Sequence, residues 1–463
     1  MNQTKREQRL LQRTLRIAVP IMVQNLITNF VALLDNIMVG QVGTEEMSGV
    51  AIVNQLMFVF NITIFGVISG GGIFCAQFFG KADHEGVRHV FRFKMISAMC
   101  VTVIGILVFF FAGDPLIRLY LHETEQNLDL EATFGFAKQY LAVMLLGLVP
   151  FSLEQVYAGT LREGGITVPP MIAGIIAVCI NTCFNALLIF GIGPFPKLGV
   201  VGAAIATLIA RVVQCGIVII WTHTHKARLP FVNGLFRTLR IPVGLRNRIM
   251  WKGLLPLTAN ECLWSAGVAV LTQCYSLRGL DVVAGLNISS TVVNLFNVLY
   301  IAFGSGVSVV IGQMLGANHL AEAKKAAPKL IWCAAGICVM VGGIMACFAG
   351  LFPMAYNTTD VVRTLATKFI LVSAVLMPIH GLLHAMYFTL RAGGKTYITF
   401  LFDCGFSWCV TVPIAFVLSR FTDLPILAVY SCAQGAELIK VLIGWVLIQK
   451  GVWISNIVVE TEA

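Results

Sequence analysis

Twelve stretches of about 20 mainly apolar residues recur along this chain, separated by short polar segments. A helix of about 20 residues spans the hydrocarbon core of a bilayer. With 58% hydrophobic and 12% charged residues, the chain has too little polar surface to cover a soluble globule. The sequence therefore predicts an all-α polytopic membrane protein with twelve transmembrane helices. The predicted spans are residues 17–39, 50–79, 93–113, 136–159, 166–192, 199–221, 250–275, 283–315, 328–350, 366–390, 397–419 and 424–449.

The charged residues lie mainly in the predicted termini and loops. Most of the 32 Lys and Arg residues fall on one side, and the positive-inside rule places that side, with both termini, in the cytoplasm. The first 16 residues have no small-residue cleavage site after a short apolar core, so they are expected to remain on the mature protein. The net charge of +10 follows from these loops and does not indicate nucleic acid. The 13 cysteines are scattered, so neither a disulfide framework nor a metal site is predicted.

The two halves of the chain resemble each other. Residues 20 to about 92 align without a gap with a stretch 236 positions further on. Equivalent residues include Pro20 and Pro256, Gln77 and Gln313, and Gly80 and Gly316. A second match aligns TLREGG at 160–165 with TLRAGG at 389–394. Two related six-helix lobes are therefore expected, an arrangement found in transporters that rock two lobes around a central site.

The repeat also predicts the domain organisation. The expected segments are a cytoplasmic lead-in at 1–16, an amino-terminal lobe at 17–222, a cytoplasmic linker at 223–249, a carboxy-terminal lobe at 250–450 and a tail at 451–463. Because six helices separate equivalent positions, both lobes enter the membrane in the same direction and are related by an axis along the membrane normal.

The first predicted span carries a polar stripe with one acidic residue. Asn25, Thr28 and Asp35 belong to a set of polar residues that recurs every three to four positions and so lies on one helix face. An ionised Asp near the middle of a membrane helix costs roughly 2.5 to 3.5 kcal/mol on insertion scales. Asp35 is therefore expected to bind a coupling ion. The alternative is an Asp near the helix end that is solvated or paired with a polar neighbour.

Further polar residues lie inside other predicted spans. The candidate cavity residues are Asn25, Asn54, Asn61, Asn287, Asn294 and Glu154. The pairs Asn54/Asn61 and Asn287/Asn294 are each seven residues apart and therefore share a helix face. As a set they are expected to line a substrate cavity, although hydrogen bonding between helices explains any single Asn as well. Glu154 is either an acid of this cavity or a solvated residue near the surface.

The second repeat differs from the first in its acids. Leu271 stands at the position of Asp35, and the acid occurs instead as Glu261. Glu261 and Asn260 lie well inside the seventh predicted span and are expected to bind substrate or ion. The alternative for Glu261 is a buried acid paired with a neighbouring polar group.

Other ionisable residues cluster in the tenth to twelfth predicted spans. His380 and His384 lack a third ligand at suitable spacing, so packing is the favoured interpretation and proton handling the second. Ion pairs are expected among Asp403, Glu437 and Lys440.

Three motifs occur in a fixed order along the chain. They are the run LLDNIMVG at 33–40, the duplicated TLRxGG and the run GAAIAT at 202–207. Together they resemble the multidrug and toxic compound extrusion (MATE) family over essentially the whole chain. The single Asp of the first span and the run NTCFNALLIFGIG at 181–193 are most similar to the DinF-like bacterial branch, which implies a bacterial plasma membrane.

This resemblance implies a cation-coupling site. In the DinF-like pattern, an N-x-x-x-D pair of helix five shares a site with the helix-one Asp and a helix-six Thr. The corresponding residues here are Asp35, Asn181, Asn185 and Thr207. This chain departs from the pattern because Asn185 occupies the acidic position. A hard cation gains from each anionic oxygen, so the departure favours H⁺ as the coupling ion, with Na⁺ as the alternative.

The sequence thus indicates a secondary active multidrug efflux antiporter, expected to be a monomer. It would export organic, mostly cationic and amphipathic compounds in exchange for H⁺ or Na⁺ by alternating access of its lobes. No phosphate-binding or nucleophile–base signature occurs, so neither an enzyme nor a cofactor beyond the coupling ion is expected. One alternative is a flippase for lipid-linked substrates of the same superfamily, which the mainly acidic membrane charges disfavour. The other is an intramembrane enzyme that uses His380, His384 and Glu261.

Overall fold

The computed structural model describes residues 3–121, 129–356 and 358–459, and these residues form helices and connecting loops without a strand. Within these ranges, eleven helical segments are long and apolar enough to cross a membrane. The pair α4 (Leu130–Leu146) and α5 (Leu148–Glu163), bent by 46°, makes a twelfth span. The prediction of an all-α protein with twelve transmembrane helices is confirmed.

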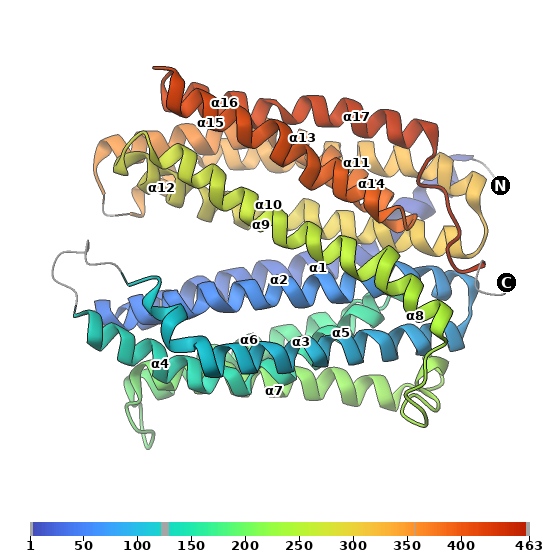
Figure 1. Cartoon of the computed structure of the whole chain (residues 1–463), viewed down its shortest axis with the longest axis horizontal. Helices are drawn as coiled ribbons and strands as arrows, with labels where there is room; N and C mark the ends of the chain where they lie inside the picture. Colours follow the sequence, from blue (N-terminus) through green and yellow to red (C-terminus); the bar gives the residue numbers. More distant parts are fainter. Residues whose placement is uncertain (1–2, 122–128, 357, 460–463) are drawn as a thin grey trace. The chain divides into compact units, whose positions relative to one another are not determined.

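Figure 1 shows the course of the chain through its helices. The first half contains α1 (Gln3–Gly40), α2 (Thr44–Lys81), α3 (His84–Arg118), α4, α5, α6 (Val168–Phe190) and α7 (Gly199–Thr224). The connection to the second half contains the 3-10 helix η1 (Pro230–Val232) and α8 (Val243–Ile249). The second half contains α9 (Leu255–Ser276), α10 (Leu280–Gly316), α11 (Leu320–Phe348), α12 (Leu351–Met354), α13 (Asp360–Ala392), α14 (Thr396–Phe400), α15 (Val412–Phe421), α16 (Ile426–Gly435) and α17 (Glu437–Lys450). Three π-helical segments are inserted, η2 (Met250–Leu254), η3 (Leu401–Gly405) and η4 (Ser407–Thr411).

The described residues divide into two compact units. The amino-terminal unit consists of Val23–Cys75 and His84–Arg246. The carboxy-terminal unit consists of the described parts of Met1–Met22, Ala76–Asp83 and Asn247–Ala463. Helices α1 and α2 therefore each run from one unit into the other. The units differ in these two stretches from the lobes expected at 17–222 and 250–450. They also divide the expected linker 223–249 between them after Arg246. The expected boundaries stay a prediction.

The described part of the expected lead-in at 1–16 forms the first turns of α1. The chain is helical from Gln3 onward. Leu10, Leu11 and Leu15 pack against the apolar core of the carboxy-terminal unit. These leucines continue the apolar face of the helix, so the first turns are held by packing as well as by the helix itself.

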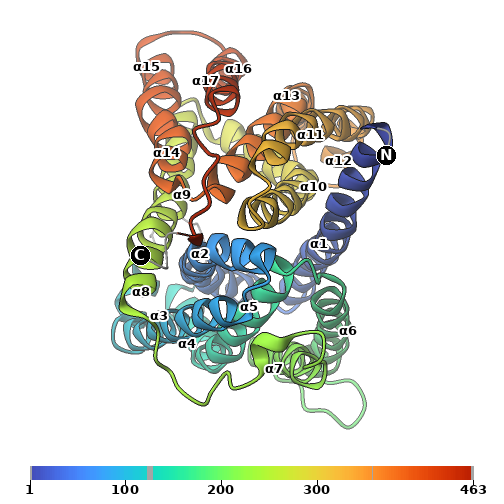
Figure 2. The same cartoon turned by 90° about the vertical axis from the view of Figure 1, so that its right-hand side faces the viewer.

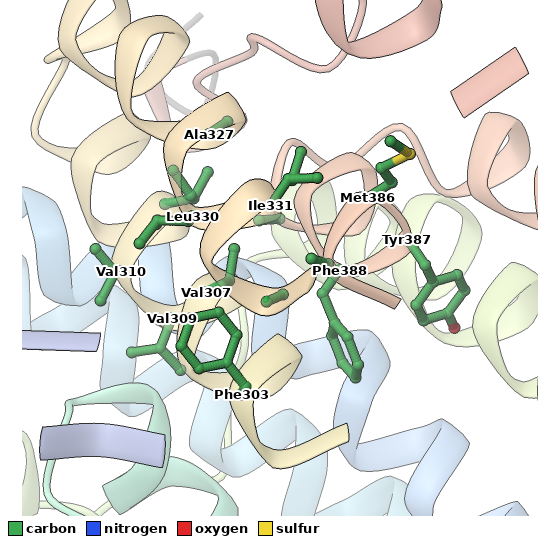
Figure 3. Packing of buried hydrophobic residues seen from close by; sticks show 14 of the residues in the cluster. Phe303, Val307, Val309, Val310, Ala327, Leu330, Ile331, Met386, Tyr387 and Phe388 are labelled. Carbon is green, nitrogen blue, oxygen red and sulfur yellow. The ribbon is translucent and has the colours of Figure 1, made fainter. Parts of the chain in front are cut away.

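The core of the carboxy-terminal unit lies between α10, α11 and α13, which pack side by side (Figure 2). Figure 3 shows Phe303 and Val307 of α10 gathered with Ile331 of α11 and Phe388 of α13. Close approach of α11 and α13 depends on a small residue, because a Cβ atom at Gly342 would lie 2.5 Å from the carbonyl oxygen of Ala374.

In the carboxy-terminal unit, the end of α2 crosses the end of α10 through residues that are equivalent in the internal repeat. A Cβ atom at Gly80 would lie 2.0 Å from the carbonyl oxygen of Gln313. A Cβ atom at Gly316 would lie 1.9 Å from the carbonyl oxygen of Gln77. Only glycine fits at either position. The repeat therefore preserves a crossing in which each copy supplies the same two residues.

The TLRxGG motif ends a helix in both halves of the chain. In the first copy α5 ends at Glu163, and Gly165 has a φ of +80°. In the second copy α13 ends at Ala392, and Gly394 has a φ of +73°. A glycine adopts this left-handed conformation without steric cost. The duplicated motif is thus explained by helix termination.

Candidate functional site

Close packing of α6 and α7, seen in Figure 2, builds the first candidate site within the amino-terminal unit. A Cβ atom at Gly202 would lie 2.6 Å from the carbonyl oxygen of Leu188, so glycine lets the two backbones approach. This approach brings Thr207 of α7 to Asn181 of α6, whose Nδ2 lies 3.2 Å from the Thr207 Oγ1. The run GAAIAT therefore supplies both the contact and the hydroxyl group.

Asp35 of α1 contacts the same face of α6. Its Oδ1 accepts a hydrogen bond of 2.6 Å from Nδ2 of Asn185. Asn181 lies one turn earlier, and turning its side-chain amide over places Nδ2 2.9 Å from Oδ2 of Asp35 while its oxygen accepts from Thr207. This orientation satisfies both amide atoms. We name Asp35, Asn181, Asn185 and Thr207 the amide cluster. The structure thus brings together all four residues of the predicted coupling site.

The amide cluster holds one carboxylate among neutral groups. Asn181 and Asn185 are buried, and Asp35 is half-buried. In the described part of the chain, Asp35 has no Lys, Arg or His partner, and Oδ1 of Asn185 is buried without a hydrogen-bond partner. The cluster can therefore bind a proton on Asp35. It can also offer a hard cation one carboxylate and the unpaired amide oxygen.

A second polar cluster lies in the carboxy-terminal unit. We name it the charged cluster and define it by Glu261, His380, Asp403, Glu437 and Lys440. Nζ of Lys440 lies 2.7 Å from Oδ1 of Asp403, and Nδ1 of His380 lies 3.0 Å from Oε2 of Glu437. The expected ion pair between Asp403 and Lys440 is confirmed, whereas Glu437 pairs with a histidine.

The π-helical segment η3 carries Asp403 to the second acid of this unit. Oδ2 of Asp403 accepts a hydrogen bond of 3.1 Å from Nδ2 of Asn260, which is 1% exposed. Oε1 of Glu261 accepts one of 3.3 Å from the hydroxyl of Tyr387. The Tyr387 oxygen also accepts from Asn260 at 3.3 Å. Asn260 and Tyr387 therefore link Glu261 to Asp403 through neutral groups.

The two histidines of α13 are packed rather than arranged as metal ligands. The ring of His380 stacks on Tyr300, and His384 lies against the same ring with centroids 4.4 Å apart. Nδ1 of His384 lies 3.0 Å from the carbonyl oxygen of His380. Among the described residues, no group of three or more His, Cys, Asp or Glu side chains could hold a metal ion.

The remaining candidates do not join either cluster by a described side-chain hydrogen bond. Asn54, Asn287 and Asn294 are exposed on their helices, and Asn25 and Asn61 are half-buried. Glu154 is buried at 3% exposure and accepts a hydrogen bond of 3.2 Å from Nε2 of Gln214. The interpretation of Glu154 as a solvated residue is therefore wrong, because the protein interior encloses it. The cavity role of these six residues stays a prediction.

Sequence analysis missed Tyr387 and Arg391. They follow His380 and His384 at intervals of three and four residues, so all four share one face of α13. Arg391 is buried, with its guanidinium 5.5 Å from the ring centroid of Phe388. That spacing is a readable signal, but Arg391 also belongs to TLRxGG and to the basic residues of the predicted cytoplasmic side.

Known proteins match almost the whole chain. The sequence profile described as MatE matches residues 20–187 and 256–417. The chain is 24% identical over 435 residues to the probable multidrug resistance protein YoeA of Bacillus subtilis, covering 92% of this chain and 90% of that protein. It is 26% identical over 431 residues to the probable multidrug resistance protein NorM of Thermotoga maritima, covering 90% and 87% respectively. Its fold is similar to that of the Vibrio cholerae MATE transporter VcmN, with a TM-score of 0.85, 17% identity and coverage of 97% and 98%.

Proposed function

This chain belongs to the MatE family, and we propose that it is a secondary active multidrug efflux antiporter. It exports organic, mostly cationic and amphipathic compounds in exchange for H⁺, with Na⁺ as the alternative coupling ion. Support for drug export comes from the relatives in B. subtilis and T. maritima, both called probable multidrug resistance proteins. The narrower assignment to the DinF-like branch stays a prediction.

One observation carries the coupling mechanism, the position of the Asp35 carboxylate between neutral amide donors. A proton on Asp35 would turn the oxygen that accepts from Asn185 into a donor. A protonated oxygen is a weaker acceptor, so we infer that the Asn185 amide turns and presents its unpaired oxygen to the new O–H group. Protonation would thereby change how α1 is held against α6.

This local change is the part of alternating access that we assign to the proton. A ligand shifts a two-state equilibrium only by its difference in affinity for the two states, and about 5.5 kcal/mol takes it from 1:99 to 99:1. Loss of the charge and exchange of one buried hydrogen bond act in the same direction. The proton then stabilises one state and the organic cation the other, and the two occupy the pathway in alternation.

We also propose that the protein acts as a monomer in the bacterial plasma membrane, with both termini in the cytoplasm. The excess of Lys and Arg in the termini and alternate loops supports this orientation. Transport of this kind involves no catalytic step. Of the residues considered for an intramembrane enzyme, His380 lies beside Glu437, and Glu261 is bonded to Tyr387.

Transport by purified protein in liposomes tests this function. A proton gradient and a sodium gradient are imposed separately, and uphill movement of a fluorescent organic cation is recorded. We expect movement with the proton gradient, with the compound recovered chemically unchanged. A dye that moves only downhill under both gradients would rule out antiport. Asp423→Asn is the matched control for acidic substitutions, because Asp423 is an exposed residue of a connecting loop.

A further inference from the structure

A basic pocket of about 710 Å³ lies in the amino-terminal unit, where the start of α3 meets the connection that follows α7, drawn in green in Figure 1. The charged residues among its described lining are four arginines and one acid. They are Arg88, Arg92, Arg237, Arg240 and Glu85. Neither candidate cluster contains any of these residues, so the coupling mechanism leaves this concentration of positive charge unexplained.

Arg92 builds the wall of this pocket. It is 5% exposed and donates to the carbonyl oxygens of Gly234 and Leu235, both at 2.8 Å, and of Arg240 at 3.4 Å. Three carbonyl acceptors satisfy its buried guanidinium and fix the backbone of the connection over α3. The pocket is therefore held in shape without a ligand.

The other arginines keep hydrogen-bonding capacity for a ligand. Arg237 and Arg240 are exposed, and neither side chain has a hydrogen-bond or ion-pair partner among the described residues. Arg88 donates through Nε to the carbonyl oxygen of Phe231 at 3.1 Å, which leaves its terminal nitrogens for another acceptor. Guanidinium groups match the oxygens of a phosphate in pairs, so this set of donors is suited to a phosphate group.

Apolar side chains interleave with these arginines along the connection. Phe236, Leu239 and Val243 are 56%, 60% and 61% exposed. Exposed apolar side chains contribute nothing to the binding of a free phosphate, whereas a phospholipid carries acyl chains beside its phosphate. We propose that this pocket binds the headgroup phosphate of an anionic phospholipid of the adjoining leaflet, with the acyl chains against Phe236 and Leu239. Basic pockets at the membrane surface bind anionic headgroups in the same way.

The bound lipid would fasten the connection between the two halves of the chain to the membrane surface. Lipid binding in this pocket does not depend on the antiport, because it requires no transport step. It can therefore be tested on protein that is not transporting.

Native mass spectrometry of the full-length protein in detergent gives the apparent Kd of each added ligand. The three ligands are phosphatidylglycerol, phosphatidylcholine and inorganic pyrophosphate. The test variant is Arg237→Gln with Arg240→Gln. The matched control is Lys226→Gln with Arg246→Gln, which removes the same charge from exposed positions of the connection that do not line the pocket.

We expect phosphatidylglycerol to bind more tightly than the other two ligands. The test variant should raise its Kd roughly 30-fold, since each basic side chain near anionic lipid contributes about 1 kcal/mol. The control variant should change the Kd less than about threefold. An equal loss in both variants, or no preference over phosphatidylcholine, would overturn the site. Pyrophosphate that binds as tightly as phosphatidylglycerol would show that a soluble anion, and not a lipid, is the ligand.

Discussion

Asp35 and Asp403 both lie within membrane-spanning helices, but their partners differ in charge. Asp35 accepts from the amide of Asn185, a neutral donor. Asp403 lies 2.7 Å from the ammonium group of Lys440, which is itself buried. A carboxylate beside a buried cation is held in its ionised form. A carboxylate among neutral amides can bind a proton or a cation without losing an ion pair. The difference supports the proposal that the amide cluster takes part in coupling, and it indicates a fixed electrostatic role for the Asp403–Lys440 pair.

The largest effect is expected from Asp35→Asn. The substitution keeps the shape of the side chain but removes its charge and its proton exchange, so uphill export in liposomes should fall to the level of liposomes without protein. Asp35→Glu keeps the charge and should retain partial activity. The Asp423→Asn control should transport like the unmodified protein. If the Asp35→Asn protein at equal abundance still drives uphill export, Asp35 is not the coupling residue and does not differ from Asp403 in this role.

Breaking the ion pair of the charged cluster should affect stability first. Lys440→Met leaves Asp403 as a partly buried charge without its cation, and removing one partner of a buried pair costs about 3 to 5 kcal/mol. Chemical unfolding of the purified protein measures this loss. Adding Asp403→Asn to Lys440→Met should recover most of it.

The exposed pair of Lys138 and Asp114 provides a matched control for this measurement. Its atoms also lie 2.7 Å apart, but both side chains are more than half exposed. Lys138→Met should therefore cost less than about 1 kcal/mol. Equal losses for Lys138→Met and Lys440→Met would mean that burial does not distinguish the two pairs.

A carboxylate added to the amide cluster should change its preference for the coupling ion. Asn185→Asp gives a cation a second anionic oxygen beside Asp35, so the sodium concentration for half-maximal transport should fall about tenfold. Asn185→Ser, which adds no charge, is the control. An unchanged sodium dependence in the Asp variant would show that the residue at position 185 does not contact the cation.

The smallest effect is expected at Glu261. Glu261→Gln removes a charge but keeps an acceptor for the Tyr387 hydroxyl, so the protein should remain folded and lose only part of its transport. The expected loss is about fivefold, because a hydrogen bond to a neutral acceptor is about 1 kcal/mol weaker than one to a charged acceptor. Dye binding and transport, measured at equal abundance, test this. Transport at the full rate with unchanged affinity would leave Glu261 with a structural role alone.

Prediction from sequence succeeded where the signal was local or repeated. Apolar length indicated the spans, and the polar stripe with Asp35 indicated the helix face that meets α6. The association of Asn185 and Thr207 with Asp35 was predicted from the family resemblance. Periodicity shows which residues share a helix face, but it does not show which other helix that face contacts.

Other features depend on contacts that a linear pattern does not contain. The π-helical turn at 401–405 shifts the register of its helix and turns Asp403 toward Asn260, and no residue type in that stretch signals such a turn. Packing of Gly80 against Gln313 was also not predicted, because the repeat shows that the two segments are equivalent but not that they touch.

The first turns of α1 pack in the carboxy-terminal unit, and this packing has a consequence for biogenesis. Arg13 donates to the side chain of Gln313, a residue 300 positions later in the chain. A ribosome releases the amino terminus first, so these turns are synthesised long before the surface of α10 on which they pack. The carboxy-terminal unit therefore cannot be completed before α10 has been synthesised. Until then, the first turns of α1 lack the residues on which they pack in the folded protein.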